Sequence, residues 1–398
     1  QVPSSDPRIV IDYDVGSDAS GLQWLCPEHT AGKIHPFLYT QGQEIHARSY
    51  LPCQDTPSVR FTFSATLSVP CALRGIMAAD KFIDREEDGG IAHETWNMSY
   101  PIPAYLVAFA VGKLESADIS ERSKVWAEPD VVARAAKEFS ELPGMMKAGE
   151  NLFGSYPWGR YDILVLPPAF PYGGMENPCL TFLSPSIVAG DKSMTTTVAH
   201  ELSHSWTGNL VTNASWSDFW INEGWTVYAE DRINEELYGR DQANLRLMLM
   251  ELEFVRDMKR FLPKTPLYTA LRPDIYTAHP DDAFSRVPYF KGAMFLKALE
   301  KEVGRDVFDG MIARYIDRYK FQSITTREFL RFLSDHLGLG LLERARAWEW
   351  VYEAGLPDNA PKLSSTLADD VYAYTLSGSI PPKKTGAAWN ASQWILYL

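Results

Sequence analysis

The sequence predicts an α+β protein in which a strand-rich part precedes a mainly helical part. The strand pattern extends to about residue 114, and its clearest run alternates apolar with polar or small residues at Phe61, Phe63, Ala65, Leu67 and Val69. From about residue 129 the apolar residues follow a helical spacing instead. This change of period predicts a domain boundary near residue 115.

Length and composition indicate a folded, acidic protein. At about 150 residues per domain, 398 residues suggest two or three domains. Hydrophobic residues make up 45% of the chain and aromatic residues 13%, and the aromatic share is far above that of a disordered chain. The 38 basic and 51 acidic residues give a net charge of −13, which argues against nucleic acid as a partner.

Neither a membrane-spanning segment nor a disulfide framework is expected. The longest apolar stretches are shorter than the roughly 20 residues that a bilayer helix needs, so we expect no membrane partner. Four cysteines without C-x-x-C spacing are too few for a framework and favour a reducing compartment, which predicts a cytoplasmic location. The first ten residues carry neither an initiator Met nor a secretion signal, as expected of a processed chain or an excerpt from a longer one.

The elements of the first half can be placed in chain order. A second apolar strand is expected at Tyr105–Val111, and a helix from about residue 129, where a proline suits the first turn. A short buried strand follows at Tyr161–Leu166. The next residues cannot be helical, because they include Pro167, Pro168, Pro171, Gly173 and Gly174.

The second half is predicted to be mainly helical. Helical patterns occur at Met194–Trp206, from near Asn222, at 241–260 and at 326–354. The residues from Gly355 are rich in Pro, Ser and Gly and indicate a linker, whereas the final run 391–398 is typical of a helix. The predicted domains are therefore 1–114, 115–355 and 356–398.

A metal-binding motif, HELSH, lies at residues 200–204. Residues four apart share one face of a helix, so His200 and His204 can present two imidazole nitrogens to one metal ion. Glu201 stays beside them and can activate a water as a general base. Because this pattern arises by chance in only about one chain in a hundred of this length, it predicts a catalytic metal centre.

A catalytic zinc ion needs a third protein ligand and an open fourth position. Glu223, nineteen residues after His204, can supply that ligand from the next helix. Glu230 lies about two turns further along the same face and is a candidate acceptor for a hydrogen bond from a ligand imidazole. The alternative is that these groups only form hydrogen bonds within a polar helix pair. We predict one catalytic Zn²⁺ bound by His200, His204 and Glu223.

The motifs resemble those of the gluzincin aminopeptidases, the group that contains aminopeptidase N, aminopeptidase B and leukotriene A(4) hydrolase. HELSH is followed after eighteen residues by the Glu of NEGWT and is preceded by GGMEN at Gly173–Asn177. The longer strings PYGGMENPCLTF, AGDKS and HSWTGNLVTN are most similar to the leukotriene A(4) hydrolase and aminopeptidase B branch. The resemblance extends from about Leu22 to the end of the chain.

This resemblance implies a fold and an activity. The fold is an antiparallel β-sheet N-terminal domain, partial in this chain, followed by a thermolysin-like, mainly helical zinc metallopeptidase domain at 115–355. Residues 356–398 would form a linker and the start of a truncated helical domain. The resemblance carries the zinc ligands over to His200, His204 and Glu223 and the general base to Glu201. The implied activity is a zinc-dependent aminopeptidase that removes the N-terminal residue of peptides with a free N-terminus.

Substrate-binding residues are implied by the same resemblance. In that family the Glu of the Gly-x-Met-Glu-Asn motif binds the substrate α-amine, which gives that role to Glu176. The residues themselves agree, since a carboxylate beside a Gly-rich strand can accept an ammonium group. The strand residues Gly173, Gly174 and Met175 are expected to pair with the peptide backbone.

Two further roles rest on the resemblance. Gln43 matches a family glutamine near the amine pocket, and Gln41 is the weaker candidate, although either residue could simply lie on a sheet surface. Tyr289 matches the family tyrosine that donates a hydrogen bond to the oxyanion of the tetrahedral intermediate, although a Tyr after Pro288 could equally be a core residue.

Two departures from the leukotriene A(4) hydrolase pattern affect the choice of reaction. Phe284 stands where that family has a tyrosine near the epoxide site, and Trp225 replaces a His next to the zinc glutamate. The alternatives to the aminopeptidase are thus a bifunctional epoxide hydrolase of the leukotriene A(4) hydrolase type and a non-catalytic peptide-binding homologue.

Overall fold

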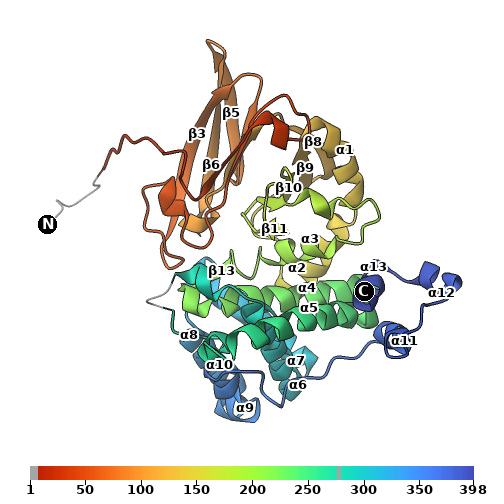
Figure 1. Cartoon of the computed structure of the whole chain (residues 1–398). Coiled ribbons are helices and arrows are strands. Elements are labelled where there is room, and N and C mark those ends of the chain that lie inside the picture. The colour runs from red at the N-terminus through yellow and green to blue at the C-terminus, as the bar shows by residue number, and fades with distance from the viewer. Residues whose placement is uncertain (1–7, 276–278) are drawn as a thin grey trace.

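The computed structural model describes residues 8–275 and 279–398. Strands dominate the N-terminal part and helices dominate the rest, and the two parts lie against each other (Figure 1). The first seven strands are β1 (Leu22–Leu25), β2 (Phe37–Thr40), β3 (Arg60–Pro70), β4 (Arg74–Met77), β5 (Lys81–Asp88), β6 (Ile91–Pro103) and β7 (Phe109–Gly112).

These strands form two sheets with antiparallel pairs throughout. One has the order β1-β2-β7-β4 and the other the order β3-β6-β5. The alternating run that predicted a strand ending at Pro70 is β3. The prediction of one strand over Tyr105–Val111 was wrong at its start, because Ala104–Leu106 forms a 3₁₀ turn before β7. The side chains of Ala104–Leu106 are buried in this turn, as they would be in a strand, so their apolar character alone did not distinguish the two.

A third sheet belongs to the helical part. It contains β8 (Glu115–Ser120), β9 (Ser123–Ala127), β10 (Asp162–Val165), β11 (Gly174–Met175) and β12 (Leu180–Leu183) in the order β11-β12-β10-β9-β8. The short strand β11 is antiparallel to β12 and lies at the sheet edge. Sheet membership changes between Gly112 and Glu115, and we keep residue 115 as the proposed domain boundary.

The remaining chain is mainly helical, as the sequence predicts. Two short strands, β13 (Val211–Asn213) and β14 (Gln322–Ile324), pair in parallel. The helices up to the end of the predicted second domain are α1 (Pro129–Glu138), α2 (Leu142–Phe153), α3 (Thr196–Ser203), α4 (Trp220–Tyr238), α5 (Arg240–Phe261), α6 (Gly292–Val303), α7 (Arg305–Tyr319), α8 (Thr326–Leu337), α9 (Leu339–Arg344) and α10 (Ala347–Tyr352).

Helix α4 is the central helix of this part. It is buried along most of its length, and it contacts α2, α3, α5 and α6. Its buried side chains include the aromatic residues Trp220, Trp225 and Tyr228 and also the polar residues Asn222 and Glu223. The polar residues of α4 are therefore held in fixed positions inside the protein.

The C-terminal region differs from the predicted helix and linker. The region 326–354 is three helices, because Gly338 and Arg346 adopt left-handed backbone conformations (φ 87° and 55°) that interrupt it. The predicted linker from Gly355 contains two short helices, α11 (Thr366–Thr375) and α12 (Lys383–Ala388), so that prediction was partly wrong. The final run is helical as expected, in α13 (Ala391–Tyr397), which lies against α5 (Figure 1).

A half-buried arginine joins the N-terminal sheets to the helical part. The Arg60 guanidinium donates hydrogen bonds to the Pro101 carbonyl (3.0 Å), to Thr212 Oγ1 (2.6 Å) and to the Asn209 carbonyl (2.7 Å). The hydrophobic core is also continuous between the two parts, from Phe37 in β2 to Trp350 in α10. In the described part of the chain, no helix is both long enough and apolar enough to cross a membrane.

Candidate active site

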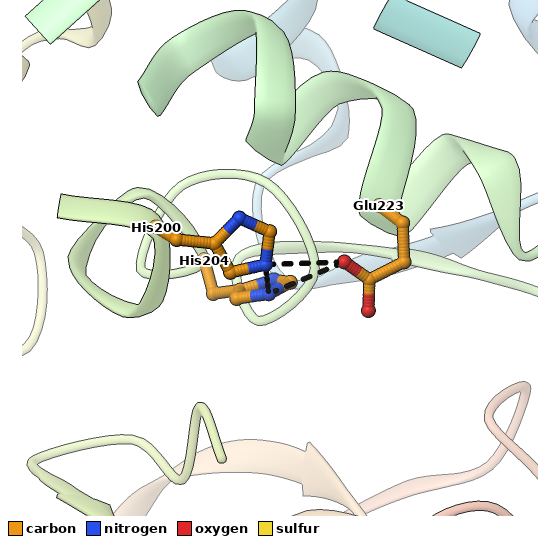
Figure 2. Close-up of side chains that lie close together, drawn as sticks. All are labelled: His200, His204 and Glu223. Atoms are coloured by element: carbon orange, nitrogen blue, oxygen red, sulfur yellow. Dashed lines mark hydrogen bonds and ion pairs between the residues drawn. The ribbon is translucent and has the colours of Figure 1, made fainter. Parts of the chain in front are cut away.

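Helices α3 and α4 bring the three predicted metal ligands together. His200 lies in α3, His204 caps its C-terminal end, and Glu223 lies in the first turn of α4 (Figure 2). The Nε2 atoms of the two histidines are 3.2 Å apart, and Glu223 Oε2 lies 3.3 Å from His200 Nε2 and 3.6 Å from His204 Nε2. All three donor atoms therefore face one point.

This donor set fits a zinc ion. Ligand atoms about 2.0–2.1 Å from a tetrahedral zinc lie about 3.3 Å from one another, close to the three separations found here. Glu223 Oε2 is buried and faces the two imidazole nitrogens. Burial lowers the pKa of His204 to about 4, which keeps its imidazole in the neutral form that binds metal.

Hydrogen bonds on the far side of each imidazole fix the ring orientation. His200 Nδ1 lies 3.0 Å from Glu230 Oε2, the contact that the spacing along α4 predicts. His204 Nδ1 lies 3.0 Å from the Thr207 carbonyl and 3.0 Å from Thr226 Oγ1. Such partners hold Nε2 toward the metal position. Thr207 and Thr226 were not identified from the sequence, although Thr226 is three residues after Glu223 on the same helix.

Glu201 is buried beside the metal ligands, 6% exposed. Burial raises the pKa of its carboxyl group well above the usual value. A Cβ atom on Gly174 would overlap this carboxylate, whereas a Cβ on Gly173 would meet only Thr197 Cγ2 at an ordinary 3.5 Å. The Glu201 side chain therefore packs against the backbone of Gly174, and a larger residue at position 174 would displace the carboxylate.

Glu176 follows the edge strand β11 and is also buried, 3% exposed. Its carbonyl accepts a hydrogen bond from Asn209 Nδ2 at 2.6 Å, and Asn222 Nδ2 lies 3.5 Å from its Oε1. Ligand atoms of Glu176, Glu201 and His204 lie within 4.8 Å of one another. Burial, with a further contribution from Glu223, raises the pKa of Glu176 to about 8. The two asparagines were not identified from the sequence.

Tyr289 lies at the same site, on a π-helical turn at Val287–Lys291 that runs into α6. Its ring stacks on the His200 ring with centroids 6.2 Å apart. The edges of Phe219 and Phe284 and the guanidinium of Arg286 hold it on other sides. Single-turn π-bulges occur often at functional sites, and this one places a buried phenol beside the metal ligands.

The two candidate glutamines differ in their contacts. Gln41 is buried, and its Nε2 lies 3.2 Å from Met175 Sδ. Gln43 is half-buried, and no side-chain hydrogen bond links it to any residue in the described ranges. The weaker candidate of the sequence analysis is thus the one that contacts β11.

Comparison with known proteins identifies the family. Residues 139–348 match the Peptidase family M1 domain, and residues 8–106 match the Peptidase M1 N-terminal domain. The chain belongs to peptidase family M1. The predicted order of domains, an antiparallel β-sheet domain followed by a helical catalytic domain, is that of the M1 family matches.

Relatives of this M1 chain include both enzymes of the branch that the motifs resemble. It is 43% identical to leukotriene A-4 hydrolase of Xenopus laevis, an alignment that covers 91% of the chain and 60% of the relative. It is 42% identical to aminopeptidase B of Mus musculus, over 90% of the chain and 55% of the relative. The structure of yeast LTA4 hydrolase in complex with bestatin superposes with a TM-score of 0.87 at 34% identity, covering 96% of this chain and 63% of that one. The M1 chain thus spans less than two thirds of the length of these relatives.

Proposed function

We propose that this M1 chain is a zinc-dependent aminopeptidase that hydrolyses the N-terminal residue from peptides. The observation that carries the proposal is the convergence of His200, His204 and Glu223 on one point, with the carboxylates of Glu201 and Glu176 beside it. The names of the relatives, aminopeptidase B among them, support the same reaction.

Zinc held by His200, His204 and Glu223 would supply Lewis-acid chemistry for polarising a carbonyl and activating a water. Glu201 accepts the proton of the attacking water at its carboxylate and passes it to the leaving amine. The elevated pKa of Glu201 suits the second step, in which the carboxyl group donates. The Tyr289 phenol donates a hydrogen bond to the oxygen on which negative charge develops.

Glu176 selects the free N-terminus in this proposal. Its buried carboxylate accepts a charge-assisted hydrogen bond from the substrate α-ammonium, which also stabilises the ionised form against burial. The peptide backbone lies along β11, where Gly173, Gly174 and Met175 leave one side of an edge strand open to strand addition.

A cycle of two enzymes and two substrates tests this assignment. We expect Glu176→Gln to retain its zinc and to lose about 2 to 4 kcal/mol of transition-state binding on a free-amine peptide. Acetylation of the substrate amine should abolish cleavage by the parent enzyme and add little further loss in the variant. Equal cleavage of free and acetylated peptides by the parent enzyme would refute the aminopeptidase proposal.

The names of the relatives include leukotriene A-4 hydrolase, but the residues of the site favour neither alternative over the aminopeptidase. Trp225 stacks on Tyr315 inside the core, with ring centroids 5.1 Å apart, and Phe284 packs against Tyr289, so neither position offers a polar group to a lipid epoxide. A non-catalytic homologue usually lacks a ligand or the base, and the chain has all four of these residues.

The cysteines bear on the location that we propose, the cytoplasm. All four, Cys26, Cys53, Cys71 and Cys179, are free thiols, which supports a reducing compartment.

A further inference from the structure

The ring of Tyr289 carries a cation on one face that the mechanism proposed above does not use. The Arg286 guanidinium lies over the phenol ring, with its Cζ atom 5.4 Å from the ring centroid. This separation is within the range of a cation–π contact, and the planar guanidinium is suited to lie against an aromatic ring. Arg286 directly precedes the π-helical turn that carries Tyr289, so the fold of one short segment sets the contact.

Three hydrogen bonds hold Arg286 in this position. Its backbone N–H donates to Asp257 Oδ2 and its Nε donates to Glu253 Oε2, both at 2.7 Å, from acids one turn apart on α5. Its carbonyl accepts a hydrogen bond from the backbone N–H of Phe290 at 2.9 Å. The Arg286 side chain is 41% exposed, so its ion pair with Glu253 contributes little to the free energy of unfolding. Replacement of the guanidinium should therefore leave the protein folded.

The surroundings of the phenol give this cation an effect on the reaction. Burial and the nearby acids Glu223, Glu176 and Glu201 all disfavour negative charge at the phenol oxygen, whereas Arg286 favours it. In the proposed reaction the phenol donates a hydrogen bond to an oxygen on which negative charge develops. A cation over the ring draws electron density from the hydroxyl group and makes it a stronger donor. The benefit is largest in the transition state, where that negative charge is greatest.

We infer that Arg286 is a positioning residue that strengthens the Tyr289 hydroxyl as a hydrogen-bond donor to the oxyanion, an inference that rests on the proposed aminopeptidase function. In this role Arg286 does not touch the substrate, because its charge acts through the phenol. The effect depends on the charge rather than on the shape of the side chain. A neutral side chain of similar length should lose the effect, and lysine should keep most of it.

A double-mutant cycle with Tyr289→Phe tests this inference. We expect Arg286→Gln and Arg286→Met to lower kcat on a free-amine peptide by about tenfold and to change KM little, because the lost interaction belongs to the transition state. Arg286→Lys should stay within about threefold of the parent. In the Tyr289→Phe background, Arg286→Gln should add no further loss, because the phenyl ring has no hydroxyl group for the cation to strengthen.

Arg260→Gln is the matched control. The Arg260 guanidinium also lies over an aromatic ring, that of Phe261 at 4.7 Å, but this pair is at the C-terminal end of α5 and is not part of the site. The variant should have the kcat of the parent. Thermal unfolding of every variant, measured on the same preparations, separates a loss of turnover from a loss of stability.

The outcomes distinguish this inference from the proposed function. A zinc-loaded parent protein that cleaves no free-amine peptide would refute the aminopeptidase and the inference with it. Parent-like kcat in both neutral variants would overturn the inference alone. A loss that persists in the Tyr289→Phe background, or that Arg286→Lys does not relieve, would assign Arg286 to the packing of the turn. If neither neutral variant folds, Arg286 is a structural residue and the inference is wrong.

Discussion

His200 Nδ1 lies 3.0 Å from Glu230 Oε2, so a carboxylate two turns along α4 holds the imidazole with its other nitrogen toward Glu223. This contact joins the two metal-binding helices through a residue that would not itself touch the ion. Its effect should therefore appear in metal affinity.

We predict that Glu230→Gln weakens zinc binding by about 10- to 100-fold, because the amide is a poorer acceptor for the imidazole N–H. Competition with a chelator of known affinity measures the change. Glu236→Gln, an exposed acid on the same helix, is the matched control and should bind zinc as the parent does. His204→Ala, which removes a ligand outright, sets the lower limit. Parent-like affinity in Glu230→Gln would mean that the contact is only structural.

Glu201→Gln should separate the base from the ligands. Glu201 is not one of the three residues whose donor atoms face the metal position, so zinc content should remain near one ion per chain. Turnover should fall at least about a hundredfold. Metal analysis and a peptide assay on the same preparation measure both quantities. Loss of zinc together with activity would show that Glu201 supports the metal site rather than the proton transfer.

Tyr289→Phe should slow turnover by about a hundredfold, since the phenol is expected to interact with charge that develops only in the transition state. Zinc content and the affinity of a simple competitive inhibitor should change little. The ring contacts with His200 and Phe219 do not involve the hydroxyl group, so the variant preserves the packing. An equal loss in turnover and in inhibitor binding would instead assign Tyr289 to the core.

Gly174→Ala should reduce activity strongly, because the added Cβ would overlap the Glu201 carboxylate and displace it. Gly173→Ala is the control, because its Cβ would meet only a methyl group at ordinary contact distance. Peptide turnover and thermal unfolding of both variants give the comparison. If the two substitutions have the same effect on turnover, the close approach of Gly174 to Glu201 is unimportant for catalysis.

The site residues that lie on one face of the same helix could be predicted from the sequence. His200 and His204 are one turn apart, and Glu223 and Glu230 are two turns apart, so spacing alone gave their common faces. Asn209 and Asn222 contact Glu176 across 33 and 46 residues of sequence, and no local pattern reports such contacts.

The fold, like the site, could be predicted from the sequence only where the signals are local. Period and proline positions predicted β3, α1 and the break before β11 because those signals are local. The 3₁₀ turn at Ala104–Leu106 and the helices α11 and α12 depend on neighbours elsewhere in the chain. At the start of α11, for example, the Thr366 hydroxyl donates a hydrogen bond to Asp241 Oδ2 at 2.7 Å.

If Glu176 selects the substrate N-terminus as proposed, the hydrogen bonds of Arg60 give the N-terminal sheets an indirect part in that selection. Arg60 in β3 holds the Asn209 carbonyl, and the Asn209 side chain holds the backbone of Glu176. A catalytic fragment that begins at residue 115 would lack this guanidinium, and Glu176, the proposed ligand of the substrate amine, would lose a support that no residue of the fragment replaces in the described structure. Selectivity for the chain end would then depend on a domain that contributes no metal ligand and no proton donor.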